Sequence, residues 1–161
     1  MRIDKNQAII DYLIQCPQIL NSPLYFNFIN IKDNTSQILT TAEDITLSRP
    51  YIDGSINRRF TFNIITFKSI TDSAIVKLEN YANENVVDLS TVQSIIDWIA
   101  DQEELRNYPD FGSDCIINSI STTTDTPRLE GINEDVSPQL AMYSISIVVD
   151  YLDTSKVIWG K

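Results

Sequence analysis

One segment, Val86 to Pro109, combines a helical period of apolar residues with a clear stop signal. Its apolar positions recur every three to four residues, and they are Leu89, Val92, Ile95, Ile96, Trp98 and Ile99. Acidic residues occupy the other side, and they are Asp97, Asp101, Glu103 and Glu104. Because Tyr108 precedes a proline, the helical conformation is disfavoured there. An amphipathic helix of about 20 residues needs a second layer to cover its apolar face.

Two long segments show the alternation of strands with one apolar face. In the segment from Leu140 to Leu152, one face carries Tyr143, Ile145, Ile147, Val149 and Tyr151. In the segment from Ile56 to Phe67, one face carries Phe60, Phe62 and Ile64. Strands that are apolar on one side only are typical of an antiparallel sheet with helices on that side. The sequence predicts an α+β fold, in which a mostly antiparallel sheet is covered on one face by two or three helices.

Shorter elements complete this prediction. Residues 24–31 and 37–41 are expected to form a hairpin, and Asp114 to Thr123 a strand with Ile116, Asn118 and Ile120 on one side. A first helix is expected over residues 5–16, with Asp4 as its N-cap and Pro17 at its end. Residues 72–83 fit a short helix better than a strand. Residues 42–55 and 124–138 are expected to be long connections.

The chain is expected to form a single domain over residues 1–161, because no linker or repeat divides it. A net charge of -10 argues against binding a nucleic-acid phosphate backbone. Cys16 and Cys115 belong to no CxxC pattern, so both are interpreted as small buried hydrophobes. The N-terminal residues do not have the pattern of a signal peptide, and no apolar run is long enough to cross a bilayer. We expect assembly in a reducing cytoplasm and no membrane partner.

The sequence offers little reactive chemistry. It contains no histidine, which removes the usual general base and most transition-metal sites. Asp97 and Asp101 are one helical turn apart, but on the polar helix side, where solvated carboxylates are the ordinary interpretation. No phosphate-binding glycine loop, dinucleotide fingerprint or calcium loop is present. The chain is therefore predicted not to be an enzyme and to bind neither a cofactor nor a metal ion.

Three parts of the chain together resemble tail terminator, or tail completion, proteins of long-tailed bacteriophages that infect Gram-positive bacteria, a group often recorded as minor capsid proteins. These parts are the strand RRFTFNIITF, the helix VQSIIDWI followed by NYP, and the segment TPRLEG that precedes the closing strand YSISIVVDYL. The resemblance covers roughly residues 56 to 152 and rests on the order of the parts.

The resemblance implies a small α+β subunit that forms a hexameric ring on the last ring of tail-tube protein. Such a ring stops tube growth and offers its other face to a head completion or connector protein. DNA then passes through the lumen without specific binding, and the chain is located in the virion at the head-tail junction.

Charged residues near the long connections are the candidates for contacts between subunits, and they are Arg58, Arg59, Arg128, Glu130, Glu134 and Asp135. The ordinary interpretation of each is a solvent-exposed charge. Three other functions stay open: a head-tail connector stopper or adaptor, an acidic inhibitor or immunity protein that mimics nucleic acid, and, least favoured, an enzyme acting on a small ligand.

Overall fold

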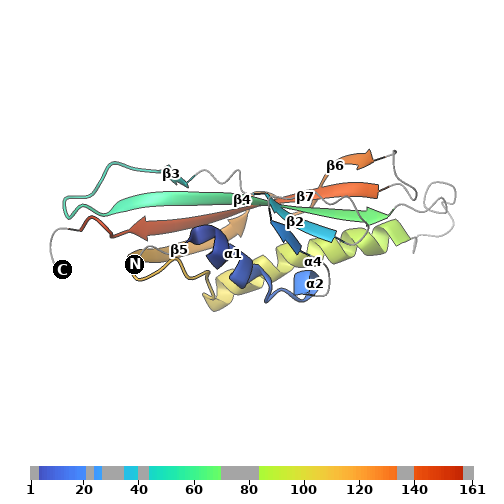
Figure 1. Cartoon of the computed structure of the whole chain (residues 1–161), viewed down its shortest axis with the longest axis horizontal. Coiled ribbons are helices and arrows are strands. Elements are labelled where there is room, and N and C mark those ends of the chain that lie inside the picture. Colours follow the sequence, from blue (N-terminus) through green and yellow to red (C-terminus); the bar gives the residue numbers. More distant parts are fainter. Residues whose placement is uncertain are drawn as a thin grey trace.

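The computed structural model describes residues 4–20, 24–26, 35–39, 44–69, 84–133 and 140–157. Within them the helices are α1 (Lys5–Leu13), α2 (Pro17–Leu20) and α4 (Glu84–Leu105). The strands are β1 (Leu24–Phe26), β2 (Thr35–Leu39), β3 (Asp44–Thr46), β4 (Ile56–Ser69), β5 (Cys115–Thr122), β6 (Arg128–Asn133) and β7 (Leu140–Asp153). Figure 1 shows an elongated molecule in which the helices lie along one side of the sheet.

The sheet is built around two strands of 14 residues each, β4 and β7, which pair antiparallel over their whole length. The strand order is β1-β2-β4-β7-β5, while β3 also pairs with β4 and β6 also pairs with β7. Only β1 and β2 run parallel among these pairs. The predicted α+β fold, with a mostly antiparallel sheet and helices on one face, is confirmed.

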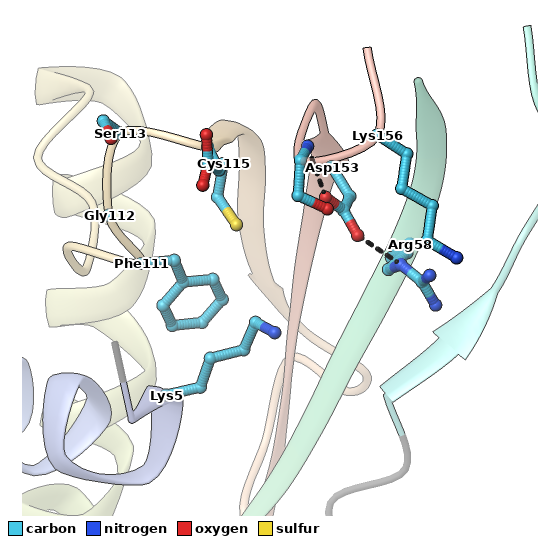
Figure 2. A pocket seen from close by; sticks show the side chains of 10 residues that line it. Lys5, Arg58, Phe111, Gly112, Ser113, Cys115, Asp153 and Lys156 are labelled. Atoms are coloured by element: carbon cyan, nitrogen blue, oxygen red, sulfur yellow. Dashed lines mark hydrogen bonds and ion pairs between the residues drawn. The ribbon is translucent and has the colours of Figure 1, made fainter. Parts of the chain in front are cut away.

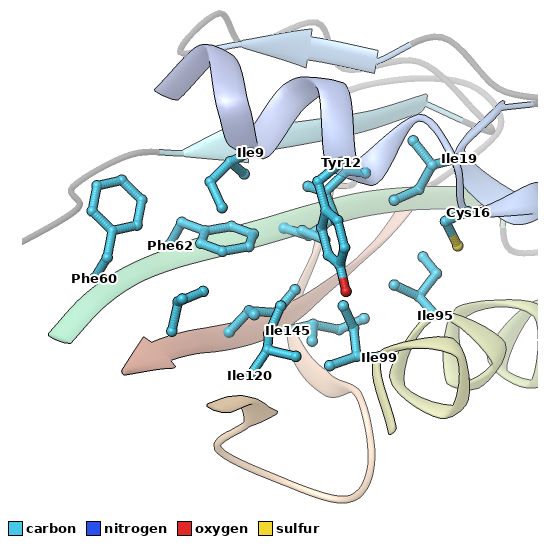
Figure 3. Close-up of a cluster of buried hydrophobic side chains, with 14 of the residues drawn as sticks. Ile9, Tyr12, Cys16, Ile19, Phe60, Phe62, Ile95, Ile99, Ile120 and Ile145 are labelled. Carbon is cyan, nitrogen blue, oxygen red and sulfur yellow. The ribbon is translucent and has the colours of Figure 1, made fainter. Parts of the chain in front are cut away.

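The core lies between this sheet and the helices, as Figure 3 shows. The alternating residues of β4 and β7 that face the helices are buried, and they are Phe60, Phe62, Ile64, Ile145, Ile147, Val149 and Tyr151. The helices contribute Ile9, Tyr12 and Leu13 from α1, and Val92, Ile95, Ile96 and Ile99 from α4. Each fully buried side chain of this size contributes roughly 1.5–3 kcal/mol through loss of contact with water. The apolar stripes predicted for the two long strands and for Val92 to Ile99 therefore form the core.

The main helix ends at Leu105, four residues before Pro109, in agreement with the expectation that the helical conformation is lost before the proline. Arg106 adopts a left-handed conformation with φ of 52°. The Asn107 amide donates to the Gln102 carbonyl at 3.0 Å, and the Arg106 amide donates to the Glu103 carbonyl at 3.1 Å. This pair of hydrogen bonds is a Schellman motif, which satisfies carbonyls of the last turn before the proline is reached.

The first helix agrees with its predicted start, but its predicted end is wrong, because α1 ends at Leu13 and Pro17 begins α2. The Asn6 amide donates to Oδ1 of Asp4 at 2.9 Å, so Asp4 is the N-cap. The Tyr12 hydroxyl donates to the Asn107 carbonyl at 2.9 Å, which ties α1 to the end of α4. Burial raises the pKa of Tyr12 well above its ordinary value.

The predicted hairpin between residues 24–31 and 37–41 is wrong, because β1 and β2 run parallel, with Leu24 beside Ser36 and Phe26 beside Ile38. Alternation of apolar residues identifies a strand but does not fix the direction in which it pairs. β2 reaches the antiparallel body of the sheet through β4 instead, with Thr35 beside Phe67.

Both predicted connections contain a short edge strand. β3 lies within residues 42–55 and pairs with Arg58 to Phe60 of β4. β6 lies within residues 124–138 and pairs with β7, with Glu130 as an extra residue at a register shift. Strands of three and six residues on the edge of a sheet have too few positions for a clear alternation.

Strand β5 does not keep one face throughout, so the prediction that Ile116, Asn118 and Ile120 share a side is wrong. A bulge at Asn118 shifts the register between Ile117 and Ser119. Ile116 is consequently exposed while Ile120 is buried. Cys16 is buried as predicted, whereas Cys115 at the start of β5 is only partly buried.

Other sequence predictions concern residues outside those described: a helix over residues 72–83, and contacts of Glu134 and Asp135. In the part of the chain that the structure describes, no helix is long and apolar enough to cross a membrane.

Candidate interaction surface at one end of the sheet

Residues 44–55, here called the arm, extend from the sheet at the end where β4 begins (Figure 1). The arm ends in a tight turn, in which the Gly54 amide donates to the Tyr51 carbonyl at 2.9 Å and the Tyr51 amide donates to the Ser55 carbonyl at 2.8 Å. Asp53 accepts from the Ser55 amide at 2.9 Å and from its hydroxyl at 2.6 Å. These hydrogen bonds lower the pKa of Asp53. The turn is thus fixed by its own polar groups.

Further contacts hold the arm against the body of the protein. The Leu47 amide donates to the Asn57 carbonyl at 2.8 Å, and the Asn57 side chain donates to the Tyr51 hydroxyl at 2.7 Å. Gly54 has φ of +93°, and a methyl group there would collide with the Lys156 carbonyl oxygen. The arm therefore has a defined conformation and a glycine that its turn requires.

The arm is unusually apolar for an exposed segment. Eight large hydrophobic side chains are exposed in the described part of the chain, and four of them lie on the arm: Ile45, Leu47, Tyr51 and Ile52. Ile52, at the tip, is 91% exposed. Clustered exposed apolar residues on an ordered segment are typical of a surface that contacts another molecule.

Asp44 anchors the base of the arm to the core. The Tyr151 hydroxyl donates to the Asp44 carboxylate, with oxygen-oxygen distances of 2.6 and 2.7 Å. Lys5 Nζ, from the first turn of α1, lies 3.1 Å from Oδ2 of Asp44. Burial and the Asp44 carboxylate together raise the pKa of Tyr151 far above its ordinary value, so the hydroxyl remains a donor.

Arg58 and Arg59, two predicted contact residues, form ion pairs within the chain. Arg58 Nε lies 2.9 Å from Oδ2 of Asp153. Arg59 forms a two-point contact with Asp150, at 2.7 and 3.0 Å, which raises the pKa of the guanidinium group. Since Arg59 and Asp150 are direct neighbours in the β4–β7 register, they lie together on the face away from the helices.

Arg128 and Glu130 lie on β6, at the other end of the sheet. Their side chains are 3.5 Å apart, and the Arg128 side chain is 75% exposed. Glu130 also accepts a hydrogen bond from the Ser144 hydroxyl. Arg128 is therefore more available to a neighbouring molecule than Arg58 or Arg59. The structure brings Arg58 and Arg59 together at one end and Arg128 and Glu130 together at the other.

A pocket of about 510 Å³ lies at the end of the sheet where β4 begins and β7 ends (Figure 2). It lies between the first turn of α1, the loop before β5 and the end of β7, and it is lined by Lys5, Arg58, Phe111, Gly112, Ser113, Asp114, Cys115, Asp153, Ser155 and Lys156. Burial raises the pKa of Cys115, although Lys5 acts in the opposite direction, so the thiol is not activated as a nucleophile. Two of the three cations already have carboxylate partners, Asp44 for Lys5 and Asp153 for Arg58.

Within residues 4–157, excluding the gaps given above, no group of three or more cysteine, aspartate or glutamate side chains is arranged to hold a metal ion.

The chain matches no protein-family model, and no curated protein matches its sequence.

Ile45, Leu47, Tyr51 and Ile52 were not among the sequence-predicted contact residues. The Asp-Gly turn signal at residues 53–54 was visible in the sequence, and apolar residues on both sides of it could have indicated a hairpin. Pro50 and the short length of β3 obscured any periodicity, and exposure depends on the tertiary structure.

Proposed function

We propose that this protein is a structural subunit of a long-tailed bacteriophage, of the tail terminator kind. It forms a ring on the end of the tail tube, stops tube growth and provides the surface for head attachment. Its partners are other copies of the chain, the tail-tube protein and a head completion or connector protein. It acts through shape and surface, without catalysis.

The observation that carries this proposal is the ordered arm with its exposed apolar residues. A monomeric soluble protein rarely keeps several large apolar side chains together on a rigid exposed segment. Here the arm is held by the Asn57–Tyr51 hydrogen bond, by the turn at Gly54 and by the Asp44–Tyr151 contact. A segment fixed before any partner arrives loses little conformational freedom on binding, which favours assembly.

The face of the sheet away from the helices also suits a protein that lines or surrounds a channel. Two pairs of polar side chains on this face bind each other, Arg59 with Asp150 and Ser146 with Asn63. Because Arg59 is paired with Asp150, its positive charge is less available to DNA phosphates. The net charge of -10 acts in the same direction. A ring whose bore is basic would contradict this part of the proposal.

The proposal is tested with the purified protein and with tail tubes assembled from the tube protein encoded by the same phage. Light scattering coupled to size-exclusion chromatography should detect assemblies larger than a dimer, and electron microscopy should show rings. Added during tube assembly, the protein should cap tube ends and shorten the tubes. Tubes of unchanged length with free ends would overturn the proposal, and binding to portal-filled heads in place of tubes would favour a connector protein.

Helix α4 provides the observation that favours the second candidate, an acidic inhibitor. The helix contains Glu84, Asp88, Asp97, Asp101, Glu103 and Glu104 but no lysine or arginine. Asp97, Asp101 and Glu104 are exposed, and exposed carboxylates can imitate a nucleic-acid backbone toward a basic partner. This alternative predicts a monomer that forms a one-to-one complex with a basic protein, so light scattering on the isolated chain separates the two functions.

A further inference from the structure

The arm and the C-terminal end of α4 lie at opposite edges of the sheet. At this end the strand order is β3-β4-β7-β5, because β3 pairs with the start of β4 and β5 pairs with the end of β7. The arm continues from β3. Helix α4 lies along β5, where Oε2 of Glu103 accepts the Ile120 amide at 2.8 Å. A contact between these two surfaces would join one edge of a subunit to the opposite edge of the next.

The end of α4 presents a patch of one exposed apolar residue and two exposed carboxylates, directly followed by the exposed Arg106. Asp101, Glu104 and Leu105 are exposed, and the Leu105 side chain is 73% exposed. Spacings of three and four residues place Glu104 and Leu105 beside Asp101 on the helix surface. Among the described residues, neither Asp101 nor Glu104 has an ion-pair partner.

The arm presents the complementary features. Its four exposed apolar side chains flank Arg49, which is exposed and whose guanidinium group has no ion pair within the part of the chain described. Apolar contact with Leu105 would remove Ile52 and Tyr51 from water, and Arg49 would meet Asp101 and Glu104.

We propose that the arm of one copy docks on the end of α4 of the next copy, with Ile52 against Leu105 and Arg49 against Asp101 and Glu104. The two surfaces are different, so the contact is head-to-tail and leaves one free arm and one free patch at the ends of an open assembly. Repetition of such a contact closes into a ring when the rotation between neighbours permits. The inference rests on the proposed function in that both require association of identical copies.

Two single variants and their mixture test this contact. Ile52→Glu disrupts the arm and Leu105→Glu disrupts the patch, and each alone should weaken self-association by roughly a hundredfold or more. An equimolar mixture should form a one-to-one dimer that grows no further, because the intact arm of Leu105→Glu meets the intact patch of Ile52→Glu. Mass photometry and sedimentation velocity measure both results. Ile14→Glu, which alters an exposed residue at the end of α1, is the matched control and should assemble normally.

A charge reversal adds an independent test. Arg49→Glu should weaken association by roughly two- to fivefold, and Glu104→Arg in the same chain should restore it. The inference is overturned if the wild-type chain stays monomeric, if either single variant assembles like the wild type, or if the mixture yields no dimer. If Ile52→Glu and Leu105→Glu both still form rings, the proposed contact between the arm and the end of α4 is wrong, while the proposed function stands. If the mixture forms the dimer but the wild-type protein does not cap tail tubes, the proposed contact is supported and the proposed function is overturned.

Discussion

The Tyr151 hydroxyl lies 2.6 Å from Oδ1 of Asp44, so the last core residue of β7 holds the first residue of the arm. Tyr151 is 1% exposed and packs edge-on against Phe111 at a centroid distance of 5.4 Å. The buried ring fixes where the hydroxyl lies, and the hydroxyl fixes where the arm begins. The stability of the core and the position of the interaction surface are thereby linked through one side chain.

Tyr151→Phe should lower the unfolding free energy by about 1–2 kcal/mol, because the hydrogen bond from Tyr151 to the Asp44 carboxylate is lost. The ion pair between Asp44 and Lys5 remains and limits the loss. Urea unfolding followed by circular dichroism measures this change. Tyr12→Phe is the matched control, since its hydroxyl binds a neutral carbonyl, and it should cost about 0.5–1.5 kcal/mol. Limited proteolysis should cut the arm faster in Tyr151→Phe only. Equal cleavage rates in the two variants would contradict the anchoring role of Asp44.

Alkaline conditions should destabilise the protein through Tyr12 and Tyr151. Both have a pKa raised above the ordinary value of 10.0, mainly by burial. A raised folded-state pKa means that the stabilisation is present below pH 10 and is lost as the pH rises above it, where the unfolded chain ionises first. The unfolding free energy should therefore fall between pH 10 and roughly pH 12. The Tyr12→Phe, Tyr151→Phe double variant should show a smaller decrease, and an identical slope would refute the assignment.

Gly54→Ala should distort the arm, because the residue combines a positive φ with close approach of the Lys156 carbonyl. We expect a loss of about 1–2 kcal/mol and weaker self-association. Gly131→Ala on β6 is the control: its added methyl group would meet nothing within 4 Å, so stability should change little. Thermal unfolding and light scattering together measure both effects. A Gly54→Ala protein as stable and as associated as Gly131→Ala would disprove the requirement for glycine.

Arg128→Glu tests the remaining sequence-predicted contact at the other end of the sheet. Arg128 is largely exposed and only 3.5 Å from Glu130, so its loss should change stability by less than about 1 kcal/mol. If Arg128 contacts a neighbouring subunit, the variant should form rings less well in size-exclusion chromatography with light scattering. An unchanged assembly profile would remove Arg128 from the interface.

The sequence was most informative where one period persists over many residues. The stripes from Phe60 to Ile64 and from Tyr143 to Tyr151 predict their strands and the buried face, because burial selects every second residue. In α4, apolar residues at helical spacing likewise predict the helix and its buried face. The bulge at Asn118 and the parallel pairing of β1 with β2 could not be predicted, since each depends on contacts between distant segments.

The candidate surface was harder to predict for a similar reason. Arg58 and Arg59 are conspicuous in the sequence, yet their partners Asp153 and Asp150 lie more than 90 residues away. Conversely, Ile52 belongs to a residue type that is usually buried, and only the tertiary structure leaves it exposed.

The hydrogen bond from the Ile120 amide to Glu103 bears on how the free chain avoids aggregation. An edge strand with unpaired backbone N–H groups can pair with a strand of another chain, and such pairing can start a fibril. The Glu103 carboxylate accepts a hydrogen bond from one of those amides, that of Ile120, and places a negative charge beside the strand edge. This cap protects one edge of the sheet from strand addition and leaves the apolar arm on the opposite edge free for the contacts proposed above.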